Sequence, residues 1–174
     1  MDNSGAPKVL RALGIDSSLR STGLGVVFSE GSRLTLVEYG LIKNASGEPL
    51  SGCLRNLYAG ITGMIKRTGA GVAVLEGGFF SRNARTAMIL GEARGTAITA
   101  CATLGLPVYE YSPRRVKQAI GGTGAASKEQ LRKMAMSLLG LTEEPPEDAG
   151  DALAIAICHL HNMSGHAALA PEPI

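Results

Sequence analysis

Apolar residues in the first quarter of the chain fall into short runs rich in Val, Leu and Gly. Residues 8–15, 22–29 and 33–42 have this composition, which favours β-strands. The Glu-Gly-Ser sequence at 30–32 is a turn signal between the second and the third run. The pattern therefore predicts three consecutive strands that form an antiparallel meander.

The rest of the chain alternates helical spacing with short apolar runs. Residues 50–67 carry apolar side chains at helical spacing, and 83–104 is a longer Ala-rich stretch closed by Gly105. Residues 71–75 are wholly apolar, as expected of a buried central strand, and 107–111 is another short strand. Three further helices are predicted over 112–120, 127–139 and 146–161.

This order of elements predicts an α/β fold with a mixed five-stranded sheet and helices on both of its faces. The length of 174 residues and a hydrophobic content of 45% suit one domain, residues 1–174, with one continuous core. Residues 1–7 and about 164–174 are expected to be flexible tails. In that sheet the first and fourth strands can lie side by side.

Several functional classes are disfavoured by the sequence. It has no apolar run long enough to cross a bilayer, and residues 1–7 lack the layout of a secretion signal. The three cysteines are widely spaced in apolar surroundings, which argues against a disulfide framework and against a zinc site. We therefore expect a soluble cytoplasmic protein.

The net charge of +2 hides an uneven distribution. Residues 78–133 hold nine basic and three acidic side chains, whereas the remainder holds eight basic and twelve acidic ones. A basic stretch beside an acidic remainder suits a protein that binds a polyanion with one surface and cations with another. Ordinary charged helix faces would give the same distribution.

Four acidic residues stand out by their positions. Asp16 follows the first predicted strand and Glu76 follows the apolar strand 71–75, while Asp148 and Asp151 share one face at the start of the last helix. Each has an ordinary explanation as a turn former or a helix cap. Brought together, four carboxylates would repel one another unless cations neutralise them, and oxygen ligands alone favour Mg²⁺ or Mn²⁺. Two such ions about 4 Å apart suit phosphodiester hydrolysis, in which one activates water and the other stabilises the leaving 3′ oxygen.

Several stretches together resemble one family. Residues 14–26 (GIDSSLRSTGLGV), 76–95, 110–119 and 148–159 (DAGDALAIAICH) match its sequence blocks in order. The family is that of the RuvC-type Holliday-junction resolvases, and the resemblance covers residues 9 to about 161. It implies an RNase H-like fold and a metal-dependent endonuclease that cuts opposed strands of a crossover junction symmetrically, in recombination and DNA repair.

The resemblance also implies particular roles. Asp16, Glu76, Asp148 and Asp151 would be the catalytic ligands of two Mg²⁺ ions, which Mn²⁺ could replace. Lys117 and Lys128 would contact the phosphate backbone, and Lys117 would also be a catalytic residue. Phe79 would stack on bases at the junction centre. From the basic stretch we expect three more DNA contacts, Arg82, Arg85 and Arg114.

The family implies partners as well. Its members act as homodimers beside a branch-migration complex of the RuvA and RuvB type. We expect the exposed apolar face of the helix 83–104 to form the dimer surface.

The chain departs from the family pattern at a few positions. Ser17 and Ser18 replace the usual Pro-Gly after Asp16, Leu24 stands where Tyr is common, and Gly150 replaces Ala. Because Asp16 itself is kept, we expect altered stiffness of the loop and retained metal binding. The C-terminal tail carries no basic run that would bind DNA.

Three alternatives remain open at this point. A sugar kinase or actin-like ATPase also begins with an Asp after a first strand, but it needs two such domains, for which 174 residues are too few. A different RNase H-like nuclease, acting on RNA–DNA hybrids or other branched substrates, shares the acids but not the blocks around Glu76 and Lys117. A junction-binding protein without cleavage would not need all four acids.

Overall fold

The computed structural model describes residues 9–77, 83–122, 126–164 and 172–174. All ten predicted elements are confirmed, with ends that shift by at most three residues. The strands are β1 (Val9–Asp16), β2 (Ser21–Glu30), β3 (Arg33–Lys43), β4 (Val72–Glu76) and β5 (Val108–Tyr111). The helices are α1 (Leu50–Thr68), α2 (Ala84–Thr103), α3 (Pro113–Gly121), α4 (Lys128–Leu139) and α5 (Glu147–Ser164).

The strands form one mixed sheet in the order β3-β2-β1-β4-β5. The first three strands pair antiparallel, as the meander predicted, whereas β4 and β5 add in parallel on the other side of β1. Parallel neighbours need a crossover, and α1 and α2 lie in the two connections that lead into β4 and β5. The first and fourth strands are therefore neighbours, as expected.

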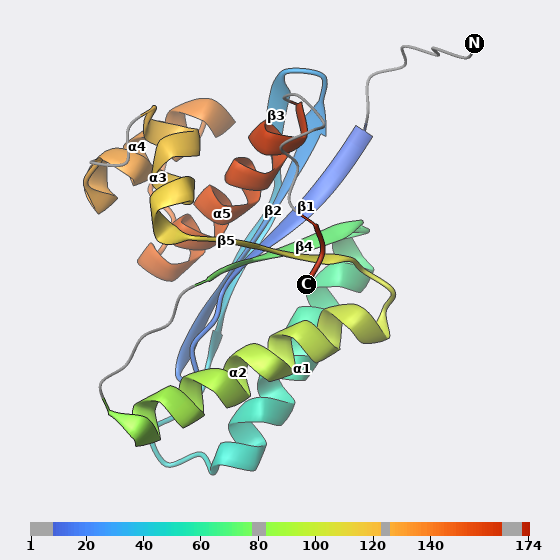
Figure 1. Ribbon diagram of the computed structural model, residues 1–174, viewed down its shortest axis with the longest axis vertical. Coiled ribbons are helices and arrows are strands. Elements are labelled where there is room, and N and C mark those ends of the chain that lie inside the picture. The colour runs from blue at the N-terminus through green and yellow to red at the C-terminus, as the bar shows by residue number, and fades with distance from the viewer. Residues whose placement is uncertain (1–8, 78–82, 123–125, 165–171) are drawn as a thin grey trace.

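Helices cover both faces of the sheet (Figure 1): α1 and α2 lie on one face, and α3, α4 and α5 on the other. Each face has its own apolar cluster. Leu13 and Ile15 of β1 join the cluster beneath α1 and α2, whereas Ala12 joins the one beneath α5. Because side chains alternate along a strand, Asp16 at the end of β1 points to the α5 face.

Local sequence signals start and stop the helices. Asn83, Ser112 and Ser127 cap α2, α3 and α4 by accepting a hydrogen bond from a backbone N–H of the first turn. Ser127 and Gln130 form a reciprocal capping box. Gly140 ends α4 at a φ of 64°, a left-handed conformation that glycine adopts without strain.

The expected flexible tails lie mostly outside the described residues. Of the described C-terminal residues, Ile174 donates its backbone N–H to the carbonyl of Val108 at 2.8 Å. The end of the chain therefore lies beside the edge strand β5. Within the described ranges, each helix is too short or too polar to be a membrane span.

Candidate active site

The pairing register of the sheet places two acids side by side. Ile15 of β1 is the parallel partner of Leu75 of β4, and each is followed by the last residue of its strand. Those last residues are Asp16 and Glu76. Alternation along both strands turns both carboxylates toward the face that α5 covers.

Helix α5 approaches this edge closely because glycines face it. Gly23 pairs with Asp16 across β1 and β2, and a Cβ on Gly23 would lie 1.9 Å from the carbonyl oxygen of Asp148. A Cβ on Gly14 would lie 1.9 Å from the carbonyl oxygen of Ala152 in the same way. Only glycine permits such an approach of backbone to backbone. The first turns of α5 therefore rest directly on β1 and β2 beside Asp16.

The strand ends and three helices enclose a pocket. Its charged lining combines three carboxylates, those of Asp16, Glu76 and Asp151, with Lys117 from α3 and with Lys128 and Arg132 from α4. The remaining lining residues are apolar: Pro113, Val116, Leu131, Ala154 and Ile155. Acids and bases thus converge from β1, β4, α3, α4 and α5 over a largely apolar floor.

Burial and the proximity of other carboxylates raise the pKa of two of these acids. Burial, followed by repulsion from Asp151, Asp148 and Glu76, raises the pKa of Asp16 from 3.8 to about 7. Burial and repulsion from Asp151 also raise the pKa of Glu76, although Lys128 and Lys117 oppose this rise. A bound cation would relieve this repulsion, because it favours the charged form of every carboxylate around it.

Two of the carboxylates are held by neighbours within the protein. Ser21 Oγ donates a hydrogen bond to Asp148 Oδ2, and Lys128 Nζ lies 3.3 Å from Asp151 Oδ2. Among the described residues, no three His, Cys, Asp or Glu side chains are already grouped as ligands of a metal ion. The donors are nevertheless all hard carboxylate oxygens, which suits Mg²⁺ or Mn²⁺.

An ion pair lies next to the backbone of Glu76. Arg94 of α2 pairs with Glu110 of β5, and its Nη1 donates to the carbonyl oxygen of Glu76 at 3.3 Å. A Cβ on Gly77 would lie 1.9 Å from Glu110 Oε1, so the glycine leaves room for the pair. Arg94 therefore connects the ion pair to the backbone of Glu76.

Comparison with known proteins places the chain in a family. The family model described as "Crossover junction endodeoxyribonuclease RuvC" matches residues 12–159. The chain belongs to the RuvC family. The proteins of that name from Chloroflexus aggregans and Stutzerimonas stutzeri are 46% and 48% identical to it over 153 and 150 residues. These matches cover 87% and 86% of this chain and 93% and 86% of the two relatives.

Solved RuvC structures share the fold. The structure of "T. thermophilus RuvC in complex with Holliday junction substrate" matches with a TM-score of 0.88 at 32% identity and covers 95% of this chain and 99% of that one. The yeast mitochondrial Holliday junction resolvase Ydc2 matches with a TM-score of 0.66 at 12% identity, which supports the fold alone. The expected RNase H-like fold is confirmed.

The two other predicted DNA contacts that the structure describes, Arg85 and Arg114, do not line the pocket. Arg114 is exposed at the start of α3. Arg85 lines a separate hollow of about 370 Å³, beside Arg20 and Met88. Phe79 and Arg82 lie outside the described residues.

Sequence reasoning missed two groups of site neighbours. Ser21 was not predicted, because nothing in its local sequence indicates that α5 brings Asp148 into contact with it. Arg94 and Glu110 were part of the blocks that resemble the RuvC family, but their pairing depends on the packing of α2 against β5. The glycines at 14 and 23 were the one available signal, since a glycine inside a strand indicates a close approach of backbone.

Proposed function

We propose that this chain is a crossover junction endodeoxyribonuclease, which resolves Holliday junctions by metal-dependent hydrolysis of phosphodiester bonds in two opposed strands. One observation carries the proposal: Asp16, Glu76 and Asp151 meet beside two lysines in one pocket of a RuvC-family chain. Such an enzyme would act in recombination and DNA repair in the cytoplasm. The related T. thermophilus RuvC is described with a Holliday junction substrate, which supports the same substrate class.

The metal would be held by the four carboxylates Asp16, Glu76, Asp148 and Asp151. Two Mg²⁺ ions, or Mn²⁺ in their place, would supply charge stabilisation at the attacking and leaving oxygens. The raised pKa of Asp16 supports this assignment, because it reflects burial of the carboxyl and then repulsion from the other three acids, and a bound cation would oppose both effects. Asp16 and Glu76 are fixed on strands, so they would define where the ions sit, while Asp148 and Asp151 close on them from α5.

The lysines would bind the DNA strand that is cut. Lys117 and Lys128 enter the pocket from two different helices, and an ammonium beside a scissile phosphate stabilises the negative charge that develops there. Arg114 lies on α3 one helical turn before Lys117, so it would extend the same contact along the phosphate backbone. We further propose Arg82 and Arg85 as DNA contacts, and Phe79 as the side chain that stacks on unpaired bases.

A homodimer would place two such sites on one junction, which symmetric cutting of opposed strands requires. We propose that residues 1–174 form a single domain and that the exposed part of α2 forms its dimer surface. Met88 on this helix is 66% exposed, and within the described part of the chain a Cβ on Gly91 or Gly95 would meet open space. A branch-migration complex of the RuvA and RuvB type would be the partner that delivers the junction.

The test is cleavage of a synthetic four-way junction beside linear duplex DNA and an RNA–DNA hybrid, each with Mg²⁺ and with EDTA. Paired, symmetric nicks in the junction alone, and only with metal, are expected. Cleavage of the hybrid without a preference for the junction would transfer the function to a different RNase H-like nuclease. Tight junction binding without cleavage in Mg²⁺ or Mn²⁺ would leave a binding protein.

The role of Lys117 is tested with a matched lysine. Lys117→Ala should lower the cleavage rate by about 100-fold or more, in line with the loss of one transition-state contact. Lys133→Ala is the control, because Lys133 is an exposed α4 lysine paired with Glu129 one turn away. Equal rates for the two variants across salt concentrations would remove Lys117 from the proposed mechanism.

A further inference from the structure

The turn that follows Asp16 is built around a serine hydroxyl. Ser18 Oγ donates to the carbonyl oxygen of Ser21 at 2.8 Å and accepts from the N–H of Ser21 at 3.2 Å. The backbone of Ser18 is bonded in turn to the Thr22 hydroxyl, whose Oγ1 accepts from the Ser18 N–H at 3.1 Å. The turn therefore holds Ser21 by both of its backbone polar groups.

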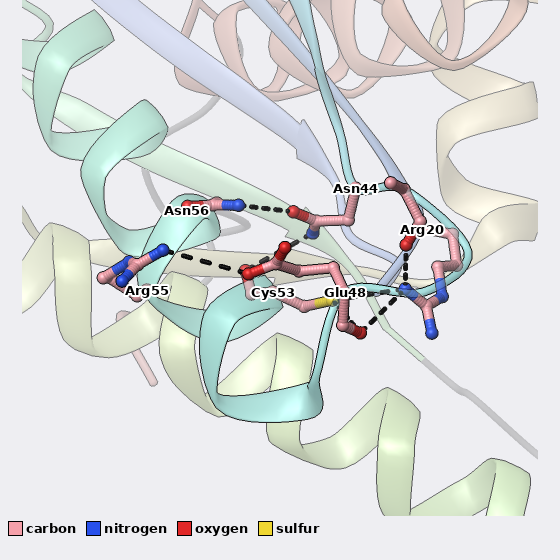
Figure 2. Close-up of polar contacts among 7 residues, drawn as sticks. Arg20, Asn44, Glu48, Cys53, Arg55 and Asn56 are labelled. Carbon is pink, nitrogen blue, oxygen red and sulfur yellow. Dashed lines mark hydrogen bonds and ion pairs between the residues drawn. The ribbon is translucent and has the colours of Figure 1, made fainter.

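The same turn is also hydrogen-bonded to the connection between β3 and α1. Figure 2 shows the Arg20 guanidinium directed at this connection, where it donates to the carbonyls of Ala45 and Glu48. Asn44 Nδ2 donates to the Leu19 carbonyl at 2.7 Å. The Asn44 amide oxygen accepts from Asn56 Nδ2 of α1 at 3.0 Å. The turn is thus anchored to the connection that leads into α1 and, through Asn44, to α1 itself.

The side chain of Ser21 extends from this anchored turn to the site. Its hydroxyl donates to Asp148 Oδ2, a contact across 127 residues of sequence. Asp148 belongs to the first turn of α5, whose backbone rests on Gly23 of β2. The hydroxyl therefore bonds the carboxylate from the same strand against which the helix packs.

We propose that Ser18 and Ser21 are positioning residues that fix the carboxylate of Asp148 for metal binding. Ser18 holds Ser21, and Ser21 orients Asp148 by occupying one lone pair of Oδ2 while the rest of the carboxylate stays available for a cation. A hydrogen bond from a second residue orients a metal ligand and commonly sets the affinity of the site. The inference rests on the proposed function, because it gives a role to neighbours of the proposed metal ligands.

The test measures Mn²⁺ binding to the DNA-free protein by titration calorimetry. Ser21→Ala should raise the dissociation constant for Mn²⁺ by about 10-fold, the lower end of the effect usual for such neighbours. Ser21→Thr keeps a hydroxyl and should restore most of the affinity. Ser18→Ala should weaken binding by a smaller factor, because Ser21 keeps its own hydroxyl but loses its backbone anchor.

The matched control is Ser29→Ala, which removes a buried hydroxyl from the other end of the same strand. Ser29 Oγ donates to the Gly31 carbonyl at 3.3 Å, and its removal should leave Mn²⁺ binding unchanged. In an Asp148→Asn background, Ser21→Ala should have no further effect on Mn²⁺ affinity. A purely structural role for Ser21 would instead lower the melting temperature equally in both backgrounds without changing the affinity.

The outcomes separate this inference from the proposed function. Equal Mn²⁺ affinities of the wild type and of folded Ser21→Ala and Ser18→Ala would overturn the role of the serines. The proposed metal site would remain in place. Tighter binding by Ser21→Ala would also overturn it, because the hydroxyl would then compete with the ion. Wild-type protein that binds no Mn²⁺ would overturn the metal site and the inference together.

Discussion

Lys128 Nζ lies 3.3 Å from Asp151 Oδ2, so an ammonium group stands beside a carboxylate that we assign to a metal ion. Asp151 in turn raises the pKa of Lys128, and the lysine therefore stays protonated there. The same lysine opposes the rise in the pKa of both Asp16 and Glu76. Lys128 thus supplies part of the positive charge that a divalent ion would bring.

Replacing this ammonium should separate metal binding from cleavage. Lys128→Gln removes an ammonium group that competes with the metal ion for Asp151. Mn²⁺ should therefore bind the DNA-free protein roughly 3-fold more tightly, a ratio that corresponds to the free energy of a partly exposed ion pair. Junction cleavage should fall nevertheless, because the phosphate contact is lost. Calorimetry and a cleavage assay on the same preparation measure the two effects. Weaker Mn²⁺ binding by the variant would mean that Lys128 supports the ligands rather than competing for them.

The raised pKa of Asp16 predicts how stability depends on pH when no divalent metal is present. The folded protein holds this carboxyl's proton up to about pH 7, whereas the unfolded chain, with a pKa of 3.8, releases it much earlier. The folded state therefore binds more protons between these values, and its free energy of unfolding should fall as pH rises from about 4 to 7. Urea unfolding in EDTA at pH 5 and pH 8 measures the difference.

Asp16→Asn should remove most of this pH dependence and stabilise the protein at pH 8 in EDTA. The gain in the free energy of unfolding should lie between about 1 and 4 kcal/mol. The upper value corresponds to the full difference between the pKa of Asp16 in the folded and in the unfolded chain. Saturating Mg²⁺ should stabilise the wild type but not the variant. An equal loss of stability between pH 5 and pH 8 in both proteins would assign the dependence to other groups.

The close approach of α5 to the sheet predicts opposite effects for two glycine substitutions. A Cβ on Gly23 would collide with the α5 backbone, so Gly23→Ala should destabilise the protein by about 3 kcal/mol or more. A Cβ on Gly150 would meet Arg132 and Pro145 at 3.5 to 3.7 Å, an ordinary contact. Gly150→Ala should therefore stabilise the protein by about 0.5–1 kcal/mol through helix propensity. Denaturant unfolding of the two variants decides, and a stable Gly23→Ala would contradict the packing described above.

The Arg94–Glu110 pair predicts a loss of activity that exceeds the loss of stability. Arg94→Gln removes both the ion pair and the charged donor to the Glu76 carbonyl, at a cost of about 1–2 kcal/mol. Cleavage should fall about 10-fold at a temperature where the variant is fully folded, because Glu76 loses its backbone support. Arg67→Gln, which breaks the exposed pair with Glu38, is the control and should cleave like the wild type. Wild-type cleavage by folded Arg94→Gln would show that the pair only stabilises the fold.

The fold and the meeting of Asp16 and Glu76 at one edge of the sheet could be predicted from the sequence, because both depend on local patterns. Short apolar runs located β1 and β4, and a carboxylate directly after each run had to reach the same edge once these strands were neighbours. Ser21 and the Arg94–Glu110 pair could not be predicted in this way. Their roles depend on how closely α5 approaches β2 and how α2 packs on β5, and these distances are set by the whole core rather than by neighbouring residues.

Asp151→Asn tests the central claim most directly, when junction binding and junction cleavage are measured on the same preparation. The substitution removes one carboxylate charge from the pocket and leaves both lysines in place. We predict that the variant binds a four-way junction at least as tightly as the wild type and makes no paired nicks in Mg²⁺ or Mn²⁺. Paired nicks at the wild-type rate would contradict the account, because the site would then cut DNA without one of its proposed metal ligands.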